Sequence, residues 1–161
     1  MRIDKEEANI LVVDDDKQLA DILTEYLNTL GYQAVAAYGG SEGLTRFRQG
    51  DFQLLITDLQ MPEMNGMKLL EAVKAVDRHV MAMVVTSYGT IESAVEAIKK
   101  GACDFIPKPY KMDELQVIVE RAFEHRAVLK QLGIFRGLSL ALLISVQFWL
   151  VLGIVLTLLW K

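Results

Sequence analysis

The sequence predicts an α/β protein: a doubly wound, five-stranded parallel sheet, followed by a single transmembrane helix. Five short apolar runs occur in the first part of the chain, and a segment with helical spacing of apolar residues follows each run. Such alternation produces right-handed crossovers and a parallel sheet that helices cover on both faces. The helix is predicted from residues 137–160, which contain no charged residue.

The limits of the predicted elements follow from apolar runs and capping residues. The strands are expected at Asn9–Val13, Gln33–Ala37, 52–57, 80–85 and 103–106. The first helix is expected to begin after the N-cap Asp16 and to end at Gly31, a residue type that suits a helix C-terminus. The later helices are expected to begin at Ser41, Asn65, Thr90 and Asp113, the last in a capping-box pattern with Gln116.

Composition divides the chain into a domain and an anchor. Hydrophobic residues make up 52% of the 161 residues, but residues 1–132 are an ordinary mixture of polar and apolar types. We expect a domain over residues 1–132, a juxtamembrane linker over residues 133–136 and a transmembrane helix over residues 137–160. The formal net charge is −4. Because phosphate binding needs a basic surface, no direct nucleic-acid partner is expected.

The C-terminal apolar stretch is long enough, as a helix, to cross the roughly 30 Å hydrocarbon core of a bilayer. Arg136 and Lys161 flank it, and Trp160 lies at its far edge. More basic residues precede it than follow it, so we expect a single-pass inner-membrane protein with its N-terminal domain in the cytoplasm. A buried core or dimerisation helix is the alternative, and a homodimer through either part of the chain is open.

Polar residues follow four of the predicted strands, at the points where those strands end. Asp14 and Asp15 follow the first strand, Asp58 the third, Thr86 the fourth and Lys108 the fifth. In open parallel sheets, ligands bind beyond these carboxyl ends. We therefore expect the five side chains to form one site.

Clustered carboxylates repel one another unless a cation lies between them. Hard oxygen ligands suit Mg²⁺, or Mn²⁺ in its place. A lysine ammonium and a threonine hydroxyl could hold the oxygens of a phosphoryl group, and one carboxylate could act as a nucleophile to form an acyl phosphate. The sequence thus predicts a site for metal-assisted phosphoryl transfer.

Four motifs give the chain a resemblance to a known family. They are VVDDD (residues 12–16), TDLQMPEMNG (57–66), VVTSYG (84–89) and FIPKPY (105–110). In this order and spacing they resemble response-regulator receiver domains, most closely those of the nitrogen-regulation class, over roughly residues 8–127. The resemblance implies a flavodoxin-like sheet of strand order 2-1-3-4-5 and a partner histidine kinase.

The resemblance also implies a role for each site residue. Asp58 would accept the phosphoryl group and, with Asp15 and the backbone carbonyl of Gln60, would ligate the metal. Asp14 would act through a metal-bound water. The protein would then be no enzyme beyond catalysing its own phosphotransfer and dephosphorylation.

The remaining roles that the resemblance implies belong to the phosphorylated state. Thr86 and Lys108 would contact the phosphoryl oxygens, and the Lys108–Pro109 peptide bond would be cis. Phe105 stands where the family often has a switching tyrosine, and Gln60 where it often has asparagine. A plain core aromatic remains the alternative for Phe105.

Two other functions fit parts of the pattern. A phosphatase of the haloacid-dehalogenase type also uses a nucleophilic aspartate with Mg²⁺, but its pattern would require Thr or Val at position 18, which is Gln18. A membrane-anchored scaffold with a receiver-like fold would not need phosphorylation. The complete set of acidic residues and Lys108 argue against this alternative, because a scaffold has no reason to keep them.

Overall fold

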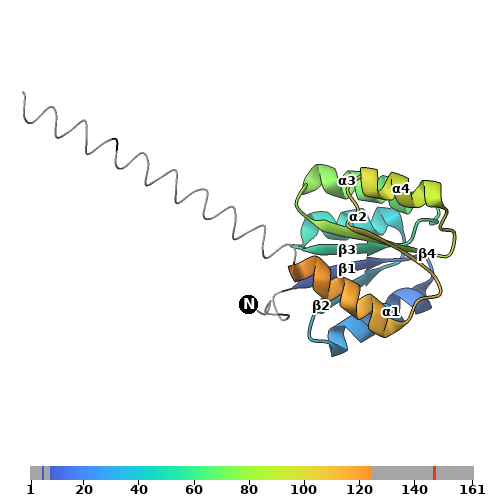
Figure 1. Cartoon of the computed structure of the whole chain (residues 1–161), viewed down its shortest axis with the longest axis horizontal. Coiled ribbons are helices and arrows are strands. Elements are labelled where there is room, and N and C mark those ends of the chain that lie inside the picture. The colour runs from blue at the N-terminus through green and yellow to red at the C-terminus, as the bar shows by residue number, and fades with distance from the viewer. Residues whose placement is uncertain (1–4, 6–7, 125–146, 148–161) are drawn as a thin grey trace, which may run out of the picture. The chain divides into compact units, whose positions relative to one another are not determined.

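The five apolar runs form one parallel sheet in the computed structural model, which describes residues 5, 8–124 and 147. The strands lie in the order β2-β1-β3-β4-β5 (Figure 1), which confirms the predicted topology. Their bounds are β1 (Asn9–Val13), β2 (Gln33–Ala37), β3 (Leu54–Thr57), β4 (Met81–Thr86) and β5 (Asp104–Pro107). The last three begin one or two residues later than predicted, because neighbouring apolar residues belong to the loops that enter the sheet.

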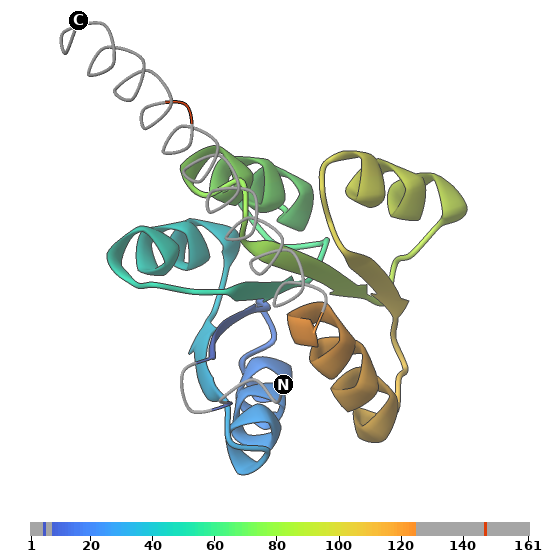
Figure 2. The same ribbon diagram turned by 60° about the vertical axis from the view of Figure 1, so that its left-hand side comes forward.

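Helices cover both faces of the sheet. They are α1 (Lys17–Thr29), α2 (Gly40–Gln49), α3 (Gly66–Val76) and α4 (Ile91–Lys99), with a fifth helix that begins at residue 112 and is described to residue 124. Figure 2 shows α1 and the fifth helix on one face and α2, α3 and α4 on the other. This arrangement explains why the central strands are apolar throughout, since both faces of β1, β3 and β4 are buried.

The core lies between the central strands and the helices. Leu11, Val13 and Leu55 are buried in a cluster with Phe47 of α2 and Leu69 of α3. Ile10 and Val12 are equally buried, and they face the opposite side because side chains alternate along a strand. The sheet is therefore fixed between two apolar layers, and its carboxyl edge is a rigid base for a site.

Helix limits confirm some of the predicted caps and correct others. The side chains of Asp16, Asn65 and Thr90 cap α1, α3 and α4, and Gly31 follows α1 with a φ of 93°. Ser41 is not a cap, because the Gly43 N–H already bonds to the Gly39 carbonyl at 2.9 Å and α2 begins at Gly40.

The predicted start of the fifth helix is also wrong. The Leu115 N–H bonds to the Lys111 carbonyl at 3.1 Å, so the helix begins before Asp113. Asp113 lies in the first turn, where a carboxylate stabilises the helix dipole without capping it. Gln116 instead accepts a hydrogen bond from the Tyr26 hydroxyl, at 3.2 Å.

The predicted linker, residues 133–136, and the predicted span, residues 137–160, lie outside the described residues apart from Gln147. Among the residues that the structure does describe, none belongs to a helix long and apolar enough to cross a bilayer. The chain divides into two units, Met1–Ala122 and Phe123–Lys161, and the site residues all belong to the first.

Candidate phosphoacceptor and metal site

Strand register brings the predicted site residues to one edge of the sheet. Val13 at the end of β1 pairs with Thr57 at the end of β3, so the next residues, Asp14 and Asp58, emerge side by side. In the same way Thr86 pairs with Pro107 of β5, and Lys108 comes next. The alignment of strand ends, not any local signal, therefore assembles the site.

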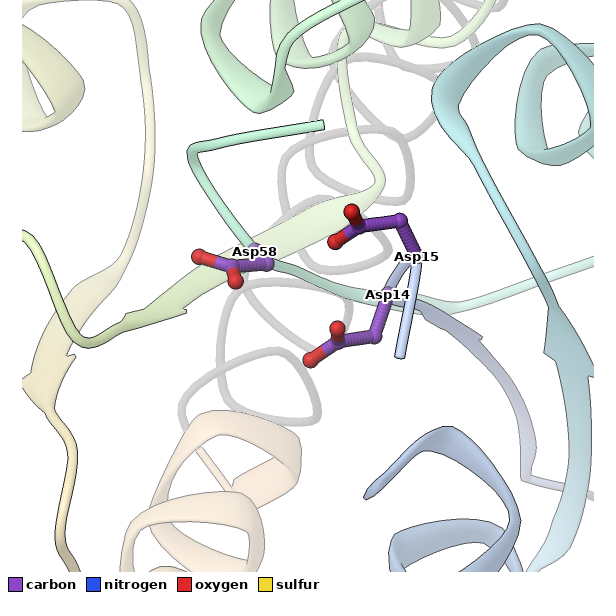
Figure 3. A group of neighbouring side chains, drawn as sticks. All are labelled: Asp14, Asp15 and Asp58. Atoms are coloured by element: carbon purple, nitrogen blue, oxygen red, sulfur yellow. The ribbon is translucent and has the colours of Figure 1, made fainter. Parts of the chain in front are cut away.

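Three carboxylates form the centre of the site (Figure 3). Each of Asp14, Asp15 and Asp58 offers one oxygen, and these oxygens lie within 4.8 Å of one another. Asp14 and Asp58 are buried, whereas Asp15 is exposed. One member of the cluster thus faces solvent, from which a hydrated cation would enter.

Backbone N–H groups fix the orientation of the two buried carboxylates. Asp14 Oδ1 accepts a hydrogen bond from the Asp16 N–H at 3.0 Å, and Asp58 Oδ1 accepts one from the Leu59 N–H at 2.6 Å. The Asp16 carboxylate itself accepts from the N–H groups of Gln18 and Leu19. Asp16 therefore caps α1, as predicted.

Lys108 provides the positive charge of the site. Its Nζ donates to Asp14 Oδ2 at 2.6 Å and lies 3.4 Å from Asp58 Oδ2. Only 13% of its side chain is exposed. Its N–H donates to the Thr86 carbonyl at 2.8 Å, and the following bond to Pro109 is cis, as the family resemblance implies.

Burial and charge act against each other on these groups. Burial raises the pKa of the Asp14 carboxyl, although the bonds from Lys108 and the Asp16 N–H lower it. Burial also opposes the charge on Lys108, but the bonds and charges of Asp14 and Asp58 outweigh it, so the pKa of the ammonium is raised. The ammonium is thus held charged, and it compensates the Asp14 carboxylate, whose charged form burial opposes.

The donor set fits a hard divalent cation. Three carboxylates offer oxygen ligands only, which suits Mg²⁺ or Mn²⁺ rather than a metal that prefers nitrogen or sulfur. The hollow beside them has a volume of about 10 Å³ and is lined by Asp14, Asp58, Lys108 and Tyr110 among others. That volume holds about one water molecule, so it does not enclose an organic substrate.

Gln60, the predicted carbonyl ligand, is exposed in the loop that follows β3. With Pro62 and Asn65 it lines a shallow, open hollow of about 430 Å³ at the surface. The loop holds Gln60 two residues from Asp58, and its role as a ligand stays a prediction.

Thr86, at the end of β4, and Phe105, in β5, lie beside the loop that leads from β4 to α4. Thr86 is fully buried, and its Oγ1 accepts a hydrogen bond from the Tyr88 N–H at 3.2 Å. Phe105 of β5 is half-buried. A methyl group on Gly89 would come within 2.8 Å of the Phe105 ring, so the loop after β4 lies directly against this aromatic side chain.

Sequence reasoning missed the part that Gly66 plays. Its N–H donates to the Leu59 carbonyl at 2.9 Å, and a methyl group on it would lie 1.9 Å from the Asp58 carbonyl oxygen. Because Gly66 has no side chain, the start of α3 can lie in close contact with the backbone of Asp58. The signal was a glycine directly after the cap Asn65, eight positions beyond Asp58.

Comparisons with known proteins agree with this geometry. Residues 10–120 match the family model of the response regulator receiver domain. Among curated proteins, the transcriptional regulatory protein ZraR of Salmonella typhimurium is 38% identical over 117 residues, which are 73% of this chain and 26% of that protein. The DNA-binding transcriptional regulator NtrC of Azospirillum brasilense is 37% identical over 116 residues, 71% of this chain and 24% of that protein.

Solved structures show the same fold. A receiver domain protein from Clostridium thermocellum aligns with a TM-score of 0.72 at 28% identity, over 76% of this chain and 98% of that chain. NtrX from Brucella abortus aligns with a TM-score of 0.74 at 30% identity, over 78% of this chain and 29% of that chain.

The chain spans about a quarter of the length of the curated relatives that it matches. Those relatives bear the names of transcriptional regulators, and the match covers only the part that corresponds to the receiver. The absence of a nucleic-acid partner therefore stays a prediction.

Proposed function

Because the chain belongs to the response regulator receiver domain family, we propose that it is a phosphorylation switch in which Asp58 accepts a phosphoryl group from a sensor histidine kinase. One observation carries the proposal: three carboxylates within 4.8 Å of one another lie beside the ammonium of a half-buried lysine. A structural core has no need of such a cluster, because buried charges are costly unless they are paired.

Asp58 would act as the nucleophile. Its Oδ1 is held by the Leu59 N–H, which fixes the plane of the carboxylate. A carboxylate oxygen attacks the phosphorus of the kinase phosphohistidine; the P–O bond forms as the P–N bond breaks, and the leaving imidazole takes a proton from solvent. Asp15, Asp58 and the Gln60 carbonyl would hold a divalent cation, with Asp14 acting through water; the cation would compensate charge on the transferring group.

Lys108 and Thr86 would hold the product. The Lys108 ammonium is already at the site, bonded to Asp14, and needs only a small movement of its flexible stem to pair with a phosphoryl oxygen. The Thr86 hydroxyl would turn from the Tyr88 N–H toward the phosphoryl group and draw the loop with it. That displacement would reach Phe105 through Gly89.

The decisive test is acyl phosphate formation. Incubation of the 161-residue chain, in mild detergent, with acetyl phosphate and Mg²⁺ should add one phosphoryl group that hydroxylamine removes, as measured by mass spectrometry. Asp58→Asn should abolish the addition, and Asp51→Asn, at an exposed aspartate, is the matched control. Equal modification of the Asp58→Asn protein would refute the assignment.

We infer further that residues 137–160 anchor the protein in the inner membrane with its receiver in the cytoplasm. The inference rests on the uncharged stretch and on the basic residues that precede it, and also on the chemistry, since ATP-dependent kinases act in the cytoplasm. Membrane fractionation of the chain with and without residues 133–161 tests it. A full chain that stays in the soluble fraction at high salt without detergent would overturn the anchor.

A further inference from the structure

Tyr38 connects the loop after β2 to α1 and α2. Its hydroxyl donates to Asp21 Oδ1 at 2.9 Å, and its N–H donates to Glu42 Oε2 at 2.9 Å. The Lys17 ammonium lies over its ring, 5.3 Å from the centroid. One tyrosine therefore contacts a cation, a carboxylate and the first turn of α2.

Lys17 is the first residue of α1 and follows Asp15 by two positions. Its ammonium lies over the ring of Tyr38, in the loop after β2. A second observation agrees with this place. The pKa of the Glu42 carboxyl is lowered, first by the hydrogen bond from the Tyr38 N–H, then by Arg46, with a contribution from the charge of Lys17.

A different position of the same side chain would harm the site. Lys17 is exposed and its four-carbon stem is flexible. Asp14 and Asp15, two of the three carboxylates that lie within 4.8 Å of one another, immediately precede it in the chain, separated from it only by Asp16. Lys108 already occupies one side of that cluster, bonded to Asp14. A second ammonium at the exposed Asp15 would stand where a divalent cation must bind.

We propose that Tyr38 is a positioning residue: it holds the Lys17 ammonium away from Asp14, Asp15 and Asp58, and so keeps these carboxylates available to the divalent cation. The inference rests on the proposed function, because it concerns the same site. Tyr38 touches neither the cation nor the phosphoryl group in this assignment; it acts through Lys17.

The expected effect is modest and has a definite sign. A cation over the ring of an exposed aromatic residue is worth roughly 0.5–1 kcal/mol, which corresponds to an approximately two- to five-fold change in population. Apparent affinity falls in proportion to the fraction of molecules whose site is free. Removal of the ring should therefore raise the Kd for Mg²⁺ by up to about five-fold.

The test compares five proteins by calorimetric titration with Mg²⁺, each as the 161-residue chain in mild detergent: the parent, Tyr38→Leu, Tyr38→Phe, Lys17→Gln and the double variant Tyr38→Leu/Lys17→Gln. Tyr38→Leu should bind Mg²⁺ more weakly. The double variant should bind as Lys17→Gln does, because no ammonium remains to compete. Tyr38→Phe keeps the ring and should stay within two-fold of the parent.

An independent readout locates the lysine directly. In the parent, the methylene protons next to the Lys17 ammonium should resonate upfield in a carbon–proton NMR spectrum, because they lie over an aromatic ring. The shift should vanish in Tyr38→Leu and persist in Tyr38→Phe. A parent without this upfield shift would overturn the inference.

The remaining outcomes separate the inference from the proposed function. If the double variant binds as weakly as Tyr38→Leu, Tyr38 acts on the loop and not through Lys17, and the inference is wrong. If the parent binds Mg²⁺ and Tyr38→Leu binds it equally well, the inference alone fails. If the parent binds no Mg²⁺, the proposed function fails and the inference with it.

Discussion

Replacement of Lys108 by methionine should expose how much the site depends on one positive charge. The variant keeps a side chain of similar length but removes an ammonium that contacts Asp14 at 2.6 Å and Asp58 at 3.4 Å. Both carboxylates have only 10% of their side chains exposed. Loss of one partner from a buried pair costs about 3–5 kcal/mol, since it leaves a charge without compensation.

The size of this loss has an upper limit that depends on pH. Instead of remaining charged, the carboxyl of Asp14, whose pKa burial already raises, can take up a proton. An aspartate of ordinary pKa lies about three units below pH 7, and each unit corresponds to about 1.4 kcal/mol. The free energy of unfolding should therefore fall by no more than about 4 kcal/mol at pH 7, and by no more than about 1.5 kcal/mol at pH 5.

The sign of this pH dependence follows from linkage. Without Lys108, the pKa of the Asp14 carboxyl in the folded state rises further above its unfolded value, so the folded state binds more protons than the unfolded one. At low pH the variant is therefore nearly as stable as the parent. Its stability falls below that of the parent as the pH rises from the pKa of the carboxyl in the unfolded state toward its pKa in the folded state. The deficit should thus grow from pH 4 to pH 7.

Urea unfolding followed by circular dichroism at pH 5 and pH 7, with and without excess Mg²⁺, measures these differences. Mg²⁺ should restore more stability to Lys108→Met than to the parent, because binding to the folded state stabilises it and the variant site is more negative. Lys68→Met removes the same charge from an exposed position on α3 and should change stability by less than about 0.5 kcal/mol. A deficit equal at both pH values and indifferent to Mg²⁺ would show that Lys108 acts by packing.

Three further changes test how the site is positioned. Gly66→Ala should lower the free energy of unfolding by about 2–4 kcal/mol in a urea titration, because its methyl group would lie 1.9 Å from the Asp58 carbonyl oxygen. Asn65→Ala should cost about 1 kcal/mol in the same titration by removing the cap of α3, and a cost near zero would mean that the cap is dispensable. Gly89→Ala should leave acyl phosphate formation intact but shift the NMR signals of Phe105, whose ring lies 2.8 Å from the added methyl group; unchanged signals would contradict the contact.

The sequence predicted that the candidate site residues lie together, because each of them follows the end of a strand. An apolar run that stops at Asp14, Asp58 or Thr86 marks the edge of a parallel sheet, and register then brings such residues together without further information. The family resemblance implied the cis Lys108–Pro109 bond, and the structure has it. The resemblance placed Lys108 against phosphoryl oxygens, and that contact stays a prediction; the structure shows its ammonium within reach of both buried carboxylates.

The sequence failed where a contact depends on packing between distant segments. Ser41 carries a capping side chain, yet α2 begins earlier because Gly40 lies against Met64, where a methyl group would come within 2.2 Å of the Met64 carbonyl oxygen. The capping rule considers side chains alone and cannot detect such an approach. The contact of Lys17 with Tyr38 has the same origin, since the loop after β2 meets the start of α1 only in the folded sheet.

Charge at the site connects the proposed chemistry to the proposed switch. With its carboxylates ionised, the cluster of Asp14, Asp15 and Asp58 carries three negative charges, and Lys108 compensates one of them. The two that remain match the charge of Mg²⁺, which explains why the donor set favours a divalent cation over a second lysine.

Conversion of Asp58 to an acyl phosphate would replace one negative charge by about two and add three acceptor oxygens. Within the described residues near this edge, the fully buried Thr86 hydroxyl is a donor that could turn toward them, and it is bonded to the Tyr88 N–H at 3.2 Å. In the proposed switch, the additional charge would act on the loop that carries Thr86 and Gly89, and through this loop on Phe105. The charge imbalance that favours a divalent cation would then also drive the conformational change.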